Sequence, residues 1–252
     1  MSEDRMPNRR SLTTRRAPII AIAMAASLAA LAADESSLAG NGGRTIVAES
    51  RFDVTNPAQQ VQLVQLVVDF PPGAWTSWHT HGGQAINLVL EGEMTLRHAG
   101  MEQGYRAGQA WTDSSTQVHA AGNSGAGKAR LLTNFLLPQG APDTIAVQES
   151  PFEPTIVYAA RFALPALPAD AQIVQQVVDL GPAWHAERAL AGFIANIVLA
   201  GEVAYKIGPE LKVYKPGEAW SAPAGTIVGD ENKSAVSARV FASYLLPRGT
   251  VP

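Results

Sequence analysis

The stretch Val61-Gln-Leu-Val-Gln-Leu-Val-Val-Asp69 returns 110 residues later as Ala171-Gln-Ile-Val-Gln-Gln-Val-Val-Asp179. Both copies are short and rich in β-branched residues, which is typical of strands. Three further blocks recur in the same order at a spacing of 109, beginning at Ile86, Tyr105 and Arg130 and returning at Ala195, Tyr214 and Arg239. Four blocks in one order indicate a tandem duplication of a small domain.

Each copy is a series of short apolar or alternating runs separated by turn residues. In the first copy these runs cover Val61–Val68, Ala85–Leu90, Met94–His98 and Leu131–Leu137. No long window combines a clean helical period with helix caps. We therefore predict an all-β chain of two tandem antiparallel β-barrels of jelly-roll type, the first over residues 45–145 and the second over residues 155–252.

The first 33 residues have the pattern of an export signal. A charged segment with Arg9-Arg10-Ser11-Leu12 precedes an apolar run from Ala17 to Ala33, and Ala30-Leu31-Ala32 offers a cleavage site. The apolar run is short for a membrane span, which needs about 20 residues. The arginine pair favours a signal peptide of the twin-arginine type over an ordinary secretory signal or a retained anchor. We expect a periplasmic or secreted mature chain that does not cross a membrane.

The composition excludes several classes of protein. The chain has no cysteine, which removes disulfides, thiolate metal sites and cysteine nucleophiles. Its net charge is −3, and the part expected to fold has no long run of basic residues, which argues against a nucleic-acid-binding protein. The hydrophobic share of 46% provides enough apolar residues for a buried core. These properties suit a protein that acts on a small molecule. The presence of two barrels in one chain leaves a monomer and a homodimer both open.

The histidines are the residues most suited to chemistry. His79 and His81 are one residue apart, so on a strand both side chains point to the same face and can reach one metal ion. His119 follows at a distance where another strand of the same barrel can bring a third imidazole to the site. The second copy has lost this set, with Arg188, Leu190 and Val228 at the three positions. The sequence therefore predicts one metal site, in the first barrel.

The spacing around these histidines resembles the cupin family. The first motif of that family is G-x5-H-x-H-x3-4-E-x6-G and the second is G-x5-P-x-G-x2-H-x3-N. The chain reads Gly73-x5-His79-x-His81, then ten residues to Gly92, and later Gly108-x10-His119-x3-Asn123. The resemblance, extended by the duplication, implies a two-domain cupin in which His79, His81 and His119 are metal ligands.

Two departures from the family pattern affect the site. The position of the family's glutamate ligand is Ala85, which cannot bind metal, while Gln84 stands one residue earlier. The resemblance leaves Gln84, water or substrate for the fourth ligand position, and Gln84 is also a candidate for proton relay. In the second motif, Ser114-Ser115-Thr116 replaces P-x-G.

Two further residues are candidates for the pocket. Asn87 is expected to point into the barrel, although its retained counterpart Asn196 in the second copy favours a structural role. Trp78 occurs only in the first copy, where Glu187 is its counterpart, and it is either a pocket residue or a packing aromatic.

The resemblance implies a metal-dependent enzyme that acts on a small organic molecule, with a three-histidine dioxygenase as the first hypothesis. One divalent transition metal ion is expected, with Fe2+ favoured and Mn2+, Ni2+, Cu2+ and Zn2+ also compatible with imidazole ligands. Two other functions fit the same residues. They are a metal-dependent lyase or isomerase, and a non-catalytic periplasmic protein that binds a small molecule. Metal occupancy is expected to fall as the pH drops through roughly 6, because the ligands must be neutral.

Overall fold

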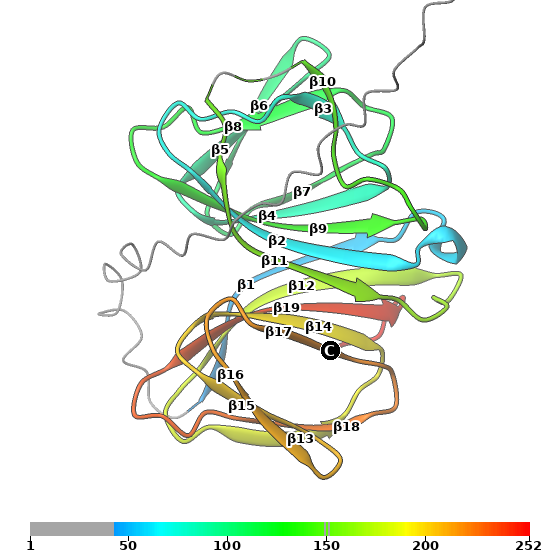
Figure 1. Ribbon diagram of the computed structural model, residues 1–252, viewed down its shortest axis with the longest axis vertical. Helices are drawn as coiled ribbons and strands as arrows, with labels where there is room; N and C mark the ends of the chain where they lie inside the picture. The colour runs from blue at the N-terminus through cyan, green and yellow to red at the C-terminus, as the bar shows by residue number, and fades with distance from the viewer. Residues whose placement is uncertain (1–42, 149, 151) are drawn as a thin grey trace, which may run out of the picture. The chain divides into compact units, whose positions relative to one another are not determined.

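The computed structural model describes residues 43–148, 150 and 152–252, and these residues form strands almost throughout (Figure 1). In this part of the chain the only helix is the single 3-10 turn η2 (Pro57–Gln59), and no helix has the length and apolar character needed to cross a membrane. The predicted all-β class with tandem barrels is thereby confirmed. The export signal predicted for residues 1–33 lies outside the described residues.

The first barrel consists of two five-stranded sheets. One sheet has the order β11 (Thr155–Ala163), β2 (Gln62–Phe70), β9 (Ala129–Leu137), β4 (Gln84–Glu91) and β7 (Ala110–Asp113). The other has the order β10 (Ile145–Gln148), β3 (Trp78–Thr80), β8 (His119–Gly122), β5 (Glu93–His98) and β6 (Met101–Arg106). All the neighbouring strands in the two sheets are antiparallel, as expected for a jelly roll.

The second barrel repeats this plan with a five-stranded and a four-stranded sheet. The larger sheet has the order β1 (Arg44–Asp53), β12 (Ala171–Leu180), β19 (Ala238–Pro247), β14 (Phe193–Ala200) and β17 (Ala219–Ala222). The smaller has the order β13 (His185–Ala189), β18 (Ile227–Glu231), β15 (Val203–Ile207) and β16 (Glu210–Tyr214).

The two barrels exchange their first strands. Strand β1 precedes the first barrel in the chain but pairs with β12, at the edge of the larger sheet of the second barrel (Figure 1). Strand β11 precedes the second barrel but pairs with β2 of the first. The limits drawn from the sequence, 45–145 and 155–252, do not foresee this exchange, because hydrophobic patterns show which segments are strands but not which strands they join.

The larger sheets of the two barrels share a buried apolar layer. One cluster joins Leu63 and Ile86 of the first barrel to Ile173 and Leu245 of the second. The fully buried Gln65 donates a hydrogen bond of 2.7 Å to the hydroxyl of Ser243 across this layer. Strands such as β2 are therefore covered on both faces, which explains why their sequences are nearly continuous apolar runs.

Removal of β1 is expected to destabilise the second barrel. A chain that begins at residue 55 exposes the edge of β12, whose residues are nearly all buried. Each lost backbone hydrogen bond contributes about 1 kcal/mol net, so a strand of this length accounts for much of a total stability of about 5–15 kcal/mol. Thermal unfolding and size-exclusion chromatography should show a lower melting temperature and self-association, relative to a chain that begins at residue 43. Equal stability of the two chains would contradict the exchange.

Candidate metal centre

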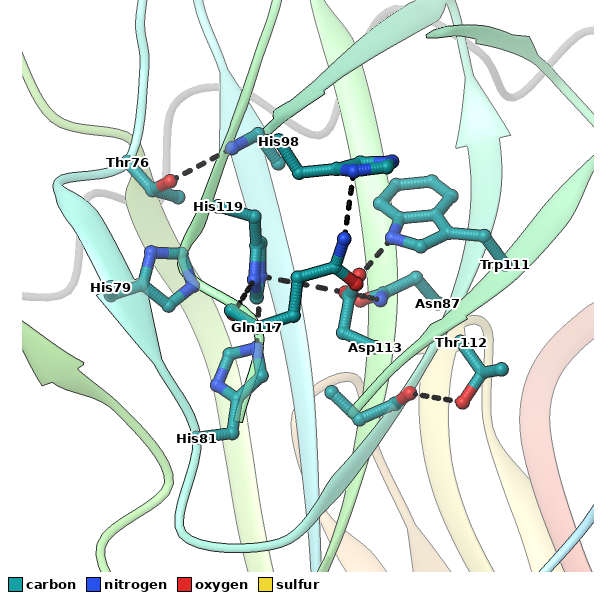
Figure 2. A network of polar contacts seen from close by, with 12 residues as sticks. Thr76, His79, His81, Asn87, His98, Trp111, Thr112, Asp113, Gln117 and His119 are labelled. Atoms are coloured by element: carbon teal, nitrogen blue, oxygen red, sulfur yellow. Dashed lines mark hydrogen bonds and ion pairs between the residues drawn. The ribbon is translucent and has the colours of Figure 1, made fainter. Parts of the chain in front are cut away.

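Three histidines converge inside the first barrel. His79 lies on β3 directly opposite His119 on β8, and His81 follows the end of β3. All three side chains are buried, and their ligand nitrogens lie within 4.8 Å of one another. Figure 2 shows the three imidazole rings facing one another. The structure thus brings together the three residues that the sequence predicted as metal ligands.

Backbone carbonyl groups fix the orientation of each ring. The Nδ1 atoms of His79, His81 and His119 lie 2.7, 2.8 and 2.9 Å from carbonyl oxygens of Ser77, Asp143 and Gln117. A carbonyl can only accept, so Nδ1 carries the proton of each neutral ring and Nε2 keeps its lone pair.

The free lone pairs meet at the centre of the cluster. Nε2 of His81 lies 3.1 Å from Nε2 of His119, and neither atom has a proton to share when both rings are neutral. Two lone pairs at this distance repel each other unless a cation lies between them. A divalent metal ion therefore fits the donor set, and the carbonyl contacts provide the outer support usual for metal-bound histidine.

Two glycines allow the chain to place His81. A Cβ atom on Gly83 would lie 2.0 Å from the carbonyl oxygen of Leu136, and one on Gly82 would lie 2.3 Å from that of Pro142. Only glycine permits such close backbone approach. The turn after His81 is thereby pressed against β9 and against the segment that supplies the Asp143 carbonyl.

Burial keeps two of the imidazoles neutral to low pH. It lowers the pKa of His79 to about 4, against the opposing effect of the Ser77 carbonyl and with a further decrease from the nearby His119. Burial also lowers the pKa of His81 to about 3, aided by the other two histidines and opposed by the Asp143 carbonyl. We therefore expect protonation of these two ligands to release the metal only well below the pH of roughly 6 that unperturbed histidine would predict.

The metal-free protein should lose stability in mild acid. The pKa of His79 is lower in the folded chain, so below pH 6.5 the unfolded chain binds more protons and the free energy of unfolding falls until the pH is below about 4. Between pH 7.5 and 5 this loss amounts to about 2 kcal/mol for His79 alone. Urea unfolding of chelator-treated protein at the two pH values measures it. His79→Gln should reduce the loss, whereas the control His185→Gln, at an exposed residue, should not. An unchanged pH dependence in His79→Gln would contradict this assignment.

A buried carboxylate completes the polar cluster. Oδ2 of Asp113, on β7, lies 3.5 Å from Nε2 of His119 (Figure 2). The same oxygen accepts hydrogen bonds of 2.9 Å from Asn87 and from the Trp111 indole, while no described residue donates to Oδ1. Burial raises the pKa of Asp113, and the His119 imidazole and the two hydrogen bonds act in the opposite direction.

The sequence analysis missed Asp113, although a signal was available. Asp113 pairs with Ala85, the position of the family's missing glutamate, so the neighbouring strand supplies a carboxylate at that level of the barrel. The block Trp111-Thr112-Asp113 returns as Trp220-Ser221-Ala222 in the second copy. The aspartate is therefore lost together with the three histidines, and the comparison that singled out the histidines also applies to Asp113.

The cluster opens into a cavity of about 230 Å3. Its walls are largely apolar, and the described residues that line it include no lysine or arginine. Two carboxylates, those of Asp113 and Glu153, line it together with the three histidines and Asn87.

Two of the predicted site residues do not line this cavity. The side-chain oxygen of Gln84 accepts from the backbone N–H of Thr55 at 2.9 Å, and its amide nitrogen donates to the Asp53 carbonyl at 3.0 Å. Gln84 thus ties β4 to the segment after β1, and these contacts do not support its assignment as a ligand or proton relay.

Trp78 is the second predicted residue that does not line the cavity. It is next to His79 on β3, where successive side chains point to opposite faces, so its side chain points away from the histidine cluster. Asn87 does line the cavity, where it holds Asp113 and accepts from Thr133.

The second barrel has no equivalent cluster among its described residues. Leu190 and Val228 are part of its apolar core. Arg188 forms an ion pair with Asp230. None of these three core-facing groups offers a neutral nitrogen to a metal ion.

Comparison with known families and structures defines the class of the protein. Residues 66–135 match the cupin domain family. The first barrel therefore contains a cupin domain, and the repeated barrel and the folds of similar solved structures agree with a two-domain cupin architecture. The resemblance stated from the histidine motifs is thereby confirmed.

The similar solved structures include two proteins of known source. AerE from Microcystis aeruginosa is 14% identical, with a TM-score of 0.52 over 80% of this chain and 98% of that one. A variant of oxalate decarboxylase from Bacillus subtilis is 11% identical, with a TM-score of 0.58 over 84% of this chain and 77% of that one. A further structure of that decarboxylase concerns its Mn(II) centres and has a TM-score of 0.54 at 11% identity, over 80% of this chain and 74% of that one. No curated protein sequence matches the chain.

Proposed function

We propose that the protein is a metal-dependent dioxygenase that acts on a small enolic or phenolic molecule in the first barrel. The observation that carries the proposal is the convergence of three imidazole Nε2 atoms beside a buried carboxylate, at the base of an apolar cavity. A bound Fe2+ ion would supply Lewis-acid and oxygen-activating chemistry there.

The lining of the cavity favours a neutral, largely apolar substrate. Its described residues carry Asp113 and Glu153 but no lysine or arginine, so a dianionic substrate has no charged partner apart from the metal ion. An enol or a phenol presents one or two oxygen atoms to the ion and an apolar body to walls such as Leu66, Phe135 and Ile156. A cavity of about 230 Å3 limits the substrate to a small molecule.

Asp113 is the group suited to take the substrate proton. An enol or phenol binds a metal ion more strongly as its anion, so a base must remove the hydroxyl proton. The carboxylate lies within the cavity, Asn87 and Trp111 fix its position, and its Oδ1 has no donor among the described residues. The raised pKa of Asp113 brings its basicity closer to that of the substrate.

Oxygen uptake tests this function. Protein isolated without an affinity tag is analysed for metal and then supplied with catechols, 1,3-diketones and related enols in an oxygen electrode. We expect consumption of one O2 per substrate cleaved, with both oxygen atoms in the products, and no consumption by His119→Ala.

The same screen separates the other two functions. Asp113 is also suited to the proton transfer of a lyase or isomerase, and substrate turnover without O2 would favour that reaction. Thermal stabilisation by a compound that is never turned over would indicate a binding protein. Either result would overturn the dioxygenase proposal.

A further inference from the structure

The second barrel retains the groups that hold Asp113 in the first barrel, but it lacks the carboxylate. In the first barrel, the side-chain N–H groups of Asn87 and Trp111 both donate to Oδ2 of Asp113. The residues at the corresponding positions of the second barrel are Asn196, Trp220 and Ala222. The aspartate alone has been replaced, by a residue that offers no acceptor.

The backbone places these groups identically in the two barrels. Residue 87 pairs with residue 111, and residue 85 with residue 113, between β4 and β7. Between β14 and β17, Asn196 pairs with Trp220, and Ile194 with Ala222. The two donors therefore face the place that a carboxylate on residue 222 would fill.

Three donors in this region are buried without a hydrogen-bond partner among the described residues. They are Nδ2 of Asn196, Nε1 of Trp220 and the hydroxyl of Tyr205, in side chains that are 3%, 6% and 2% exposed. Burial raises the pKa of Tyr205, so its hydroxyl keeps a proton to donate. The nearby Trp220 indole acts to lower the pKa of Tyr205, but the indole N–H and the Tyr205 hydroxyl are not in hydrogen-bonding geometry. Buried donors without acceptors are costly, and a ligand with acceptor atoms relieves that cost.

A small cavity of about 20 Å3 lies among these groups. It has room for one or two water-sized groups. Its charged residues are Arg44, Arg188 and Asp230, with a net formal charge of +1. Arg188 already pairs with Asp230, whose other oxygen has no partner among the described residues, and Arg44 adds the unbalanced positive charge at the exposed end of the lining.

We propose that this cavity binds a small carboxylate anion of about the size of formate. The anion takes the place that the Asp113 carboxylate has in the first barrel, and it accepts hydrogen bonds from Asn196 and Trp220. Arg44 and Arg188 supply positive charge, and the dimensions of the cavity exclude larger acids. The second barrel is then a ligand site of its own, without a metal ion.

Titration with formate tests the site. The full-length protein is placed in chloride-free buffer at constant ionic strength, and binding of 13C-formate is followed by NMR and by thermal unfolding. One equivalent should bind with a dissociation constant on the order of 1 mM, which is near the limit for three non-hydrogen atoms. The melting temperature should rise by about 5 °C at 100 mM formate. The same result is expected in His119→Ala, which separates this site from formate bound to a metal ion in the first barrel.

Substitutions at residue 222 locate the anion. Ala222→Asp supplies an internal carboxylate and should abolish formate binding, and Ala222→Asn should do so by filling the space without adding charge. The matched control Ala224→Asp adds the same charge at an exposed position two residues away and should bind formate like the wild type. Absence of binding by the wild type would mean that the cavity holds only water, and undiminished binding by both residue-222 variants would place the anion elsewhere. Either result overturns the proposal.

Discussion

We expect one divalent metal ion per chain when the protein is isolated without a tag and its metal content is measured by inductively coupled plasma mass spectrometry. The three imidazoles of the first barrel present unprotonated Nε2 atoms to one point, and the equivalent positions of the second barrel offer none. His119→Ala leaves two imidazoles and should weaken metal binding by more than about 100-fold, because it removes a ligand and not merely an outer contact.

Two control variants make this prediction specific. His185→Ala removes an exposed histidine from the second barrel, and Arg188→Ala alters the residue at the position of His79. Both should retain one equivalent of metal. Two equivalents in the wild type, or full occupancy in His119→Ala, would contradict a single three-histidine site.

Replacement of Asp113 should have the second-largest effect. Asp113→Asn keeps an oxygen to accept from Asn87 and Trp111 but removes the negative charge beside His119. We expect metal affinity to fall by about 10-fold, in the range measured for outer-sphere partners of metal ligands. Turnover of an enol or phenol should fall by about 100-fold or more if the carboxylate is the base.

Spectroscopy distinguishes the two roles of Asp113. The electron paramagnetic resonance spectrum of protein loaded with Mn2+ should change in Asp113→Asn if the carboxylate contacts the ion, and the change does not depend on turnover. The exposed surface variant Glu93→Gln serves as the control and should leave affinity, spectrum and turnover unchanged. Metal affinity and turnover equal to those of the wild type in Asp113→Asn would contradict both proposed roles of Asp113.

Much of this structure could be predicted from the repeated sequence. Strands β2, β4, β5 and β9 lie where the apolar runs predicted them, because a half-buried or fully buried strand leaves a pattern in its own residues. The three histidines were also predictable, since their spacing and their loss from the second copy are both properties of the sequence.

Other features depend on pairing between distant strands. Gln84 was a reasonable ligand from its place in the motif, yet its amide is occupied by Thr55 and by the carbonyl of Asp53, which β1 brings into reach. Asp113 belongs to a different strand from the glutamate of the family motif, and only the register of β4 and β7 places it beside Ala85. Such cross-strand neighbours are set by the tertiary fold and leave no local pattern, so the only sequence signal for Asp113 was its replacement by Ala222 in the second copy.

The exchange of first strands also governs the order in which the chain can fold during synthesis. Arg44 leaves the ribosome early, but its partner Leu180 is not yet made, and the sheet of the first barrel lacks its edge strand until residue 163 has emerged. Bringing together strands that are so far apart in the chain costs conformational entropy before the contacts between them can form, and this slows folding. A nascent chain that stops between the barrels can complete neither, so we expect the native state to form late and as one event, after nearly all of the polypeptide is available.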